Sequence, residues 1–292
     1  MKKDRRWVLI VLGLLAAFLI VYFGFKWWNK DVVTIKTIAV SRGTIEAIVS
    51  VSGFVDAPVY DLSPKMGGKI INIFVKEGAR VQAAQTLAEF DDLTRLIAPA
   101  GGIVAKINYD KGETVPMGMP AIVVVNFNRS WVEAQIDEID IETVRVGDKV
   151  RITSDVYPDK VFMGEIYWIA PLAELRKVGG RVKMDEESYV FPCKIRFVGG
   201  HEGLKVNMSV NVDILTKVND QALILPREAV IAKDDSSYVY KVNRGRVAET
   251  KVEVGIRSYS SLEAVSGVKV GDIVAVSNVA KLKNKGRIKI ER

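Results

Sequence analysis

The residue types that carry most enzyme and metal chemistry are scarce in this chain. Its 292 residues contain one histidine, His201, and one cysteine, Cys193. A zinc site built from histidine and cysteine needs more ligands than these two, and a Ser-His-Asp triad would depend on His201 alone. His201 lies between glycines in VGGHEGL, and Cys193 lies in the apolar run YVFPCKIRF. We therefore expect a structural or solvent-facing turn histidine and a cysteine buried in a strand, with no disulfide within the chain.

Acidic and sulfur-containing side chains offer two further candidates for metal binding. The cluster DEIDIE (137–142) could bind a cation, but its spacing differs from that of a calcium loop. The same residues suit the start of one short helix, with Asp137 as N-cap, and a solvated face. Met117 and Met119 of PMGMP have no histidine or cysteine nearby and are expected to pack at the base of a domain.

Phosphate-binding motifs are also missing from the sequence. No P-loop and no glycine-rich dinucleotide motif stands between a predicted strand and a predicted helix. The sequence therefore predicts no catalytic residue, no metal ligand and no cofactor site, a pattern that indicates a protein other than an enzyme.

The formal net charge of +7 is concentrated at the two ends of the chain. Residues 1–6 contribute +3 and residues 281–292 contribute +5, which leaves −1 for the rest. A basic face for DNA or RNA is therefore not expected. The basic C-terminal stretch is either a solvated strand or a contact with anionic lipid head groups.

The chain begins with the pattern of a membrane anchor. After the basic start MKKDRR, the segment from Trp7 to Phe25 has 19 residues without charge, and Trp27 and Trp28 follow it. A helix of that length spans roughly 28 Å, close to the ~30 Å hydrocarbon core of a bilayer. A cleaved signal peptide is the alternative, but no small-x-small cleavage site follows, and the tryptophans suit a membrane interface. We expect residues 1–30 to form an uncleaved, single-pass inner-membrane anchor with a cytoplasmic N-terminus and the bulk of the chain outside.

Beyond this segment the sequence has the pattern of a β protein. Short runs rich in Val and Ile, such as TIKTIAV, KVRITS and SVNVDIL, are separated by Gly, Asp, Asn and Pro. Strand signals at intervals of about ten residues are typical of small barrels and sandwiches. The fold class is therefore predicted as mostly β.

The chain contains an internal repeat with a period of 34 residues. GGKIINIFVKEGARVQAAQTL (67–87) aligns with GGIVAKINYDKGETVPMGMPA (101–121), so that Gly68 falls on Gly102 and Gly78 on Gly112. Each copy is predicted to be strand, turn, strand, with Gly78 and Gly112 at tight turns that need positive φ. Because an isolated hairpin is marginally stable in water, the two copies are expected to pack face to face as a small sandwich.

The two copies of the repeat, with the short segment that connects them, resemble the biotinyl/lipoyl fold. Carrier domains and membrane-fusion, or periplasmic adaptor, proteins both use this fold. We call the connecting segment the joint. In carriers the joint presents a lysine for biotin or lipoate, whereas in adaptors it usually opens into a long α-helical hairpin. Here the joint is FDDLTRLIAP, and no lysine lies between Phe90 and Pro99. Lys65 and Lys69 of PKMGGK open the first copy instead, so the carrier function is the less favoured alternative.

The rest of the chain resembles the same adaptor family, of the hemolysin D type. Residues 130–171 and 203–215 resemble its β-barrel domain, and ALILPREAVI (222–231) with the segments after it resembles its membrane-proximal domain. The resemblance implies three nested domains beyond the anchor. They are a membrane-proximal domain of residues 31–42 and 216–292, a β-barrel domain of 43–58 and 126–215, and a lipoyl-like domain of 59–125.

The joint is where this chain departs from the family. Six residues replace the hairpin: Asp91, Asp92, Leu93, Thr94, Arg95 and Leu96. A helical hairpin that reaches ~100 Å would need about 65 residues in each arm. The contact between such a hairpin and an outer-membrane channel therefore does not transfer to this chain. Either the lipoyl-like tip faces the exit partner, or the partner extends to meet it, or no outer channel is involved.

The resemblance implies an adaptor that couples an RND- or ABC-type transporter to an exit path by assembly and without chemistry of its own. Its implied partners are an inner-membrane transporter, further copies of itself in a ring, membrane lipid through the anchor, and an outer-membrane channel if one takes part. A structural or regulatory envelope protein associated with an ABC transporter is the alternative. No nucleic-acid partner and no cofactor is expected.

Overall fold

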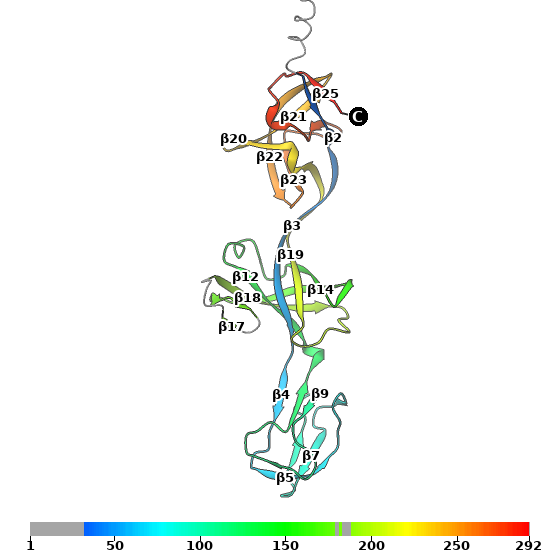
Figure 1. Ribbon diagram of the computed structural model, residues 1–292, viewed down its shortest axis with the longest axis vertical. Coiled ribbons are helices and arrows are strands. Elements are labelled where there is room, and N and C mark those ends of the chain that lie inside the picture. Colours follow the sequence, from blue (N-terminus) through cyan, green and yellow to red (C-terminus); the bar gives the residue numbers. More distant parts are fainter. Residues whose placement is uncertain (1–31, 179–180, 183–187, 292) are drawn as a thin grey trace, which may run out of the picture. The chain divides into compact units, whose positions relative to one another are not determined.

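The computed structural model describes residues 32–178, 181–182 and 188–291 (Figure 1). The predicted anchor residues Trp7, Phe25, Trp27 and Trp28 lie outside these ranges. In the described ranges, no helix has the length and apolar character to span a membrane. The same ranges contain strands and three short 3-10 helices, η1 (Phe127–Arg129), η2 (Arg227–Ala229) and η3 (Val279–Lys281), and no α-helix. The prediction of a mostly β fold is confirmed for this part of the chain.

The described residues form two compact units. One consists of the residues up to Ala47 and from Lys217 onward, and the other is Ile48–Thr216. Strands β3 (Ser41–Asp56) and β19 (Ser209–Pro226) are long enough to contribute to both units. The larger unit contains a barrel and the repeat.

Six strands close the barrel, in the order β13-β14-β18-β12-β3-β19, because β13 also pairs with β19. The remaining four are β12 (Trp131–Asp137), β13 (Lys149–Ser154), β14 (Tyr157–Ile169) and β18 (Tyr189–Val198). Two-residue strands accompany them: β15 (Glu174–Leu175) on β18, and β16 (Lys177–Val178) with β17 (Arg181–Val182). Alternate residues point inward, as in Val132, Ala134 and Ile136, which are 0% exposed.

The segment after β12 was expected to hold one short helix, and this expectation is wrong. Residues 138–143 form consecutive turns, in which the only α-helical (i to i−4) hydrogen bond runs from the amide of Ile141 to the carbonyl of Asp137 (3.2 Å). Ile139 is 86% exposed, so the segment has no continuous apolar face to bury. The side chain of Asp137 does not cap a helix, because it pairs with Arg176.

The repeat forms two four-stranded sheets, β10-β5-β7-β8 and β4-β11-β9-β6. Their strands are β4 (Val59–Leu62), β5 (Gly68–Ile73), β6 (Arg80–Val81), β7 (Thr86–Phe90), β8 (Arg95–Ile97), β9 (Gly102–Ile107), β10 (Thr114–Val115) and β11 (Ile122–Val125). The two sheets share one apolar core. Equivalent positions of the two copies meet in it, since Ile70 and Val104, and likewise Val81 and Val115, are at most 4% exposed.

The two copies interlock more closely than strand, turn, strand predicts. The returning strand of each copy pairs with the opening strand of the other, β6 with β9 and β10 with β5. The registers obey the 34-residue period: Val81 pairs with Gly102, and Val115 pairs with Gly68. A two-residue strand has too few bonds to hold a local hairpin, so each copy completes its sheet with the other.

The smaller unit is a further β domain with two apolar clusters. Its strands are β1 (Val33–Ile35), β2 (Thr37–Ala39), β20 (Val230–Lys233), β21 (Ser236–Asn243), β22 (Arg246–Arg257), β23 (Ser261–Ser266), β24 (Ile273–Ala275) and β25 (Ile288–Ile290). The first described strand, β1, lies parallel to the last, β25, and Val33 pairs with Ile288. Ile35 is 0% exposed, so both ends of the described chain contribute to this core.

Candidate functional site

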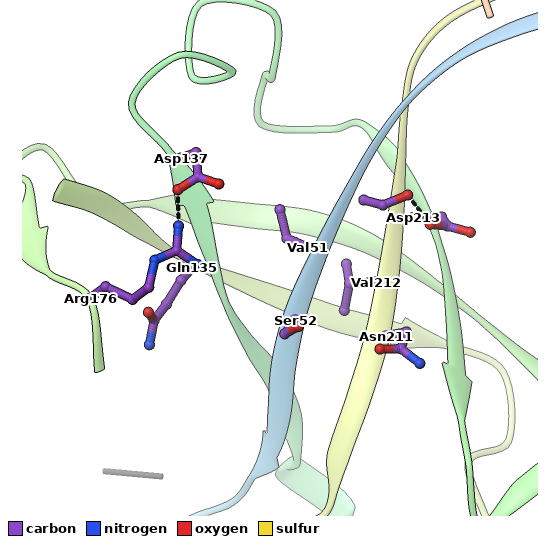
Figure 2. A pocket seen from close by; sticks show the side chains of 9 residues that line it. Val51, Ser52, Gln135, Asp137, Arg176, Asn211, Val212 and Asp213 are labelled. Carbon is purple, nitrogen blue, oxygen red and sulfur yellow. Dashed lines mark hydrogen bonds and ion pairs between the residues drawn. The ribbon is translucent and has the colours of Figure 1, made fainter. Parts of the chain in front are cut away.

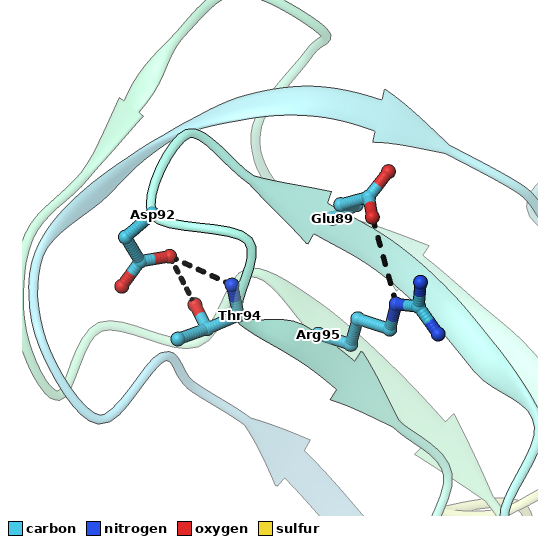
Figure 3. A network of polar contacts seen from close by, with 4 residues as sticks. All are labelled: Glu89, Asp92, Thr94 and Arg95. Atoms are coloured by element: carbon cyan, nitrogen blue, oxygen red, sulfur yellow. Dashed lines mark hydrogen bonds and ion pairs between the residues drawn. The ribbon is translucent and has the colours of Figure 1, made fainter.

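The joint between the two repeat copies is a tight β-hairpin (Figure 3). Strands β7 and β8 are antiparallel, with Glu89 paired to Arg95. The amide of Leu93 donates to the carbonyl of Phe90 (3.0 Å), and the amide of Phe90 donates to the carbonyl of Thr94 (2.9 Å). This is a turn followed by one left-handed residue, Leu93 at φ 65°. The prediction that no long helical hairpin leaves this joint is confirmed.

Polar side chains fasten the turn from within. The Oδ1 atom of Asp92 accepts hydrogen bonds from the amide of Thr94 (2.9 Å) and from its hydroxyl (2.5 Å), as Figure 3 shows. The hydrogen bond from the Thr94 hydroxyl is the main reason why the pKa of Asp92 is lowered. One strand position further on, the Arg95 guanidinium lies 3.5 Å from the Glu89 carboxylate.

The six joint residues divide into one core residue and five exposed ones. Leu96 is 7% exposed and packs in the shared core, whereas Leu93, which follows the two central residues of the turn, is 76% exposed. The other four are exposed and polar. The joint therefore presents one apolar side chain surrounded by charge, a surface suited to contact with another protein and not to covalent chemistry.

The four glycines singled out in the repeat have two different environments. Gly78 and Gly112 have φ values of 81° and 96°, the conformation expected of them. Gly68 and Gly102 begin strands in close contact with backbone or side chains. A Cβ on Gly102 would lie 2.5 Å from the carbonyl oxygen of Val125, and one on Gly68 would lie 3.2 Å from Asp91 Oδ1. The structure thus brings Gly68 to the joint and leaves Gly78 and Gly112 at separate turns.

The barrel carries a polar pocket of about 290 Å³ that the sequence did not reveal (Figure 2). The pairing of β12 with β3 ends at Ala134 and Gly53, and the pocket opens directly beyond that pair. Its lining residues are Ser50, Val51, Ser52, Gln135, Asp137, Arg176, Asn211, Val212 and Asp213. Polar residues at alternate positions of three strands were the available signal, but the point where two strands separate depends on tertiary structure.

The charged groups of this pocket already have partners within the barrel. Arg176 pairs with Asp137 and donates from Nε to the hydroxyl of Ser188 (3.1 Å). The Ser50 hydroxyl donates to Asp213 (2.5 Å). Dashed lines in Figure 2 mark this hydrogen bond and the ion pair between Arg176 and Asp137. With one ion pair and one carboxylate that accepts from a hydroxyl, the pocket suits hydrogen bonding to a polar group.

His201 and Cys193, the remaining candidate residues from the sequence, pack against other side chains of the barrel unit. His201 stacks on Phe197 with a centroid distance of 4.5 Å, and its Nε2 lies 2.8 Å from the hydroxyl of Ser130. Cys193 is 0% exposed in the barrel core, where burial raises the pKa of its thiol to about 12. Among the described residues, no group of three or more His, Cys, Asp and Glu side chains could hold a metal ion.

The expectation that Met117 and Met119 pack at the base of a domain is wrong. They are 72% and 50% exposed. Both lie in a turn in which the amide of Met119 donates to the carbonyl of Pro116 (3.2 Å), so their side chains project from a loop and not from a strand face.

Three family models match successive parts of the chain. A barrel-sandwich hybrid domain of RND membrane-fusion proteins matches residues 59–127, a YknX-like β-barrel domain matches 130–214, and the C-terminal permuted SH3-like domain of YknX matches 222–290. These matches cover the repeat, the barrel and the later part of the smaller unit.

Curated relatives and solved structures agree with these models. The nodulation protein NolF of Rhizobium meliloti is 28% identical over 208 residues, 68% of this chain and 53% of the relative. The macrolide export protein MacA of Yersinia pestis is 27% identical over 192 residues, 64% of this chain and 49% of the relative. The chain therefore spans about half the length of these curated relatives.

Among solved structures, MacA from Actinobacillus actinomycetemcomitans aligns with a TM-score of 0.67 at 18% identity, covering 82% of this chain and 99% of that one. A MacA-MexA chimera that contains the Pseudomonas aeruginosa MexA α-hairpin domain aligns with a TM-score of 0.61 at 19% identity, covering 81% and 98%. At these identities the likeness is one of fold.

Proposed function

We propose a function for this chain from one premise, that it belongs to the membrane-fusion protein family, whose members are adaptor proteins and not enzymes. In this proposal it is an adaptor subunit of an efflux or export system. It acts by assembly, holding a transporter of the RND or ABC type against an exit path as a homo-oligomer. The transporter supplies the energy.

The observation that carries the proposal is the closed joint. The barrel-sandwich domain is complete, with its shared core and interlocked sheets, but its joint ends in the short turn at Leu93. An adaptor with this joint has no arm to extend, so we propose that the joint hairpin itself contacts the exit partner. Leu93 is the apolar centre of that contact, since it is 76% exposed.

The proposal includes the domain limits and location derived from the sequence. Residues 1–30 anchor the chain in the inner membrane, and residues 31–42 with 216–292 form the membrane-proximal domain. Residues 43–58 with 126–215 form the barrel, and residues 59–125 form the lipoyl-like domain. The barrel and the membrane-proximal domain dock on the external face of the transporter.

Photo-crosslinking in native membranes tests the proposed contact at the joint. A photoreactive residue replaces Leu93 in the full chain, and a matched control carries it at Tyr259, which is 95% exposed in the smaller unit. We expect a crosslink to a second protein from position 93 and a different pattern from position 259. Identical patterns from both positions, or crosslinks to lipid only, would contradict a contact at the joint.

Affinity purification and deletion test the wider adaptor function. Purification of the full chain in several mild detergents should recover a transporter. Deletion of the gene should change the accumulation of a drug or metabolite, whereas loss of a purely structural envelope protein would leave export unchanged. Absence of any transporter from all purifications would remove the basis of the proposal.

A further inference from the structure

One end of the smaller unit carries a concentrated basic surface, which we name the basic rim. It consists of two short segments, residues 243–247 and 281–291, which contain seven basic side chains and one acidic one. The basic residues are Arg244, Arg246, Lys281, Lys283, Lys285, Arg287 and Lys289. All except the half-buried Arg287 are exposed. Residues 1–30 carry +5 and the basic rim +6 of the total of +7, so the rest of the chain carries −4, and this surface is distinct.

Backbone hydrogen bonds bring the two segments together. The amide of Ile288 donates to the carbonyl of Gly245 (3.0 Å), and the amide of Lys285 donates to the carbonyl of Val247 (2.8 Å). Between these bonds, Arg246 and Arg287 face each other in an isolated antiparallel bridge. Arg246 is exposed opposite the half-buried Arg287, so the meeting of the two segments concentrates positive charge at this end of the unit.

Two turns of the basic rim hold basic residues in a conformation that suits other amino acids better. Arg244, at φ 45°, precedes Gly245 in the two-residue loop between β21 and β22. Lys285, at φ 65°, precedes Gly286 in a turn closed by a hydrogen bond from the Gly286 amide to the Lys283 carbonyl (2.9 Å). Gly, Asn and Asp are the usual residues at such positions. Arginine and lysine there add charge at the expense of stability.

The basic rim lies where the chain enters the smaller unit. Strand β25 runs parallel to β1, Lys289 pairs with Thr34, and the amide of Val33 donates to the carbonyl of Arg287 (3.3 Å). Residue 33 follows the proposed anchor after only a few residues, which limits how far the basic rim can lie from the membrane surface.

We propose that the basic rim binds the head groups of anionic phospholipids. This inference rests on the proposed anchor, and it adds a second, electrostatic contact with the bilayer. Lysine and arginine side chains near an anionic leaflet are attracted within about one Debye length, ~8 Å at physiological ionic strength. The contact would hold the smaller unit in a fixed orientation on the membrane while the rest of the chain assembles with its partners.

Energy transfer in nanodiscs tests the lipid contact with the full chain. Ala248 is exposed on β22, and A248C accepts a donor fluorophore selectively because Cys193 is buried. The acceptor is a head-group-labelled lipid in discs of pure phosphatidylcholine or of a mixture with phosphatidylglycerol. We expect higher transfer efficiency in the anionic discs, and we expect the difference to disappear at high salt.

Matched variants separate this contact from a folding defect. The rim variant is R244N/R246Q/K283Q/K285N, and the control R42Q/R227Q/K251Q/K269Q removes the same charge from exposed positions elsewhere in the unit. The rim variant should lose the difference between the two discs, while the control keeps it. The asparagines suit positive φ, so R244N/K285N should raise resistance to urea while it lowers transfer in anionic discs.

Other outcomes would overturn the proposal. Equal transfer in both lipids, or an equal loss in the rim and control variants, would exclude a specific anionic-lipid contact. If the rim variant lost a co-purifying transporter with unchanged transfer, the basic rim would bind an acidic protein surface. If the proposed anchor does not insert into the bilayer, the chain will not elute with phosphatidylcholine discs. Flotation of the chain with anionic vesicles would then test the basic rim by itself.

Discussion

The amide of Gly78 donates a 2.8 Å hydrogen bond to the carbonyl of Val104, and 34 residues later Gly112 makes the same bond, also 2.8 Å, to Ile70. Each glycine turn is therefore attached to the opening strand of the other copy. The amide of Val104 in turn donates to the carbonyl of Ala79 (2.9 Å), so the contact is reciprocal. The sequence repeat is thus also a repeat of hydrogen bonds between the copies.

This symmetry predicts equal effects for equivalent glycines. No atom would contact an added Cβ at Gly78 or Gly112, so an alanine at either position suffers only from the left-handed φ. G78A and G112A should each lower the free energy of unfolding by about 1–2 kcal/mol, measured by urea denaturation. G101A is the control, since Gly101 lacks a positive φ and an added Cβ would make an ordinary 3.5 Å contact. A large difference between the two glycines would argue against equivalent turns.

The joint should gain stability from a residue that suits its turn. Leu93 has φ 65° and contributes little to the core, so L93G should raise the free energy of unfolding by roughly 0.5–1 kcal/mol. L96A, three residues later but 7% exposed in the core, should lower it by about 2–4 kcal/mol. Changes of opposite sign in the free energy of unfolding, measured by urea denaturation, would support the hairpin. A lower free energy of unfolding in both variants would contradict the left-handed conformation of Leu93.

Acid should weaken one ion pair of the smaller unit. The hydrogen bond from Lys241 Nζ to Asp272 Oδ2 (2.6 Å), with a second from the amide of Lys269, lowers the pKa of Asp272. A carboxyl with a lowered folded pKa stabilises the fold above its unfolded pKa, and this stabilisation disappears as the pH falls through the folded value. D272N should therefore be less stable than the wild type at pH 7, by about 1 kcal/mol at most because the pair is partly exposed, and equally stable at the lowest pH.

A double-mutant cycle identifies the pair as the cause. K241M should reduce stability at pH 7, and adding D272N to it should cause little further loss. Additive losses at neutral pH would show that the two side chains act independently.

The only thiol should be unreactive in the folded chain. Cys193 is 0% exposed, and burial raises the pKa of its thiol to about 12, so very little thiolate exists at pH 8. Iodoacetamide should label it at the rate of global unfolding and rapidly in concentrated urea, as mass spectrometry would show. Fast labelling under native conditions would indicate that the barrel opens locally at β18.

Local patterns in the sequence were sufficient for the strands and the repeat. Alternating Val and Ile mark the barrel strands, and the spacing of Gly78 and Gly112 marks two equivalent turns, because φ and side-chain direction are local properties. The short joint was visible for the same reason, since it depends only on how many residues separate Phe90 from Pro99.

Features that depend on distant partners could not be predicted in this way. The exchange of β6 and β10 between the copies requires pairing partners more than 20 residues away. Asp137 was expected to cap a helix, but its carboxylate binds Arg176, 39 residues later. The basic residues near the C-terminus are evident in the sequence. Their proximity to Arg244 and Arg246, however, depends on how β21, β22 and β25 fold.

The parallel pairing of β1 with β25 also has a consequence for biosynthesis. Ile35 is among the first residues of the smaller unit to leave the ribosome, but the strand beside it, Ile288–Ile290, is among the last. The core around Ile35 therefore cannot close until Ile288–Ile290 has been made. The barrel and the repeat, which are complete by Thr216, can fold earlier. A chain that stops before Ile288 would keep the barrel and the repeat, but it would leave the core around Ile35 open and accessible to proteases.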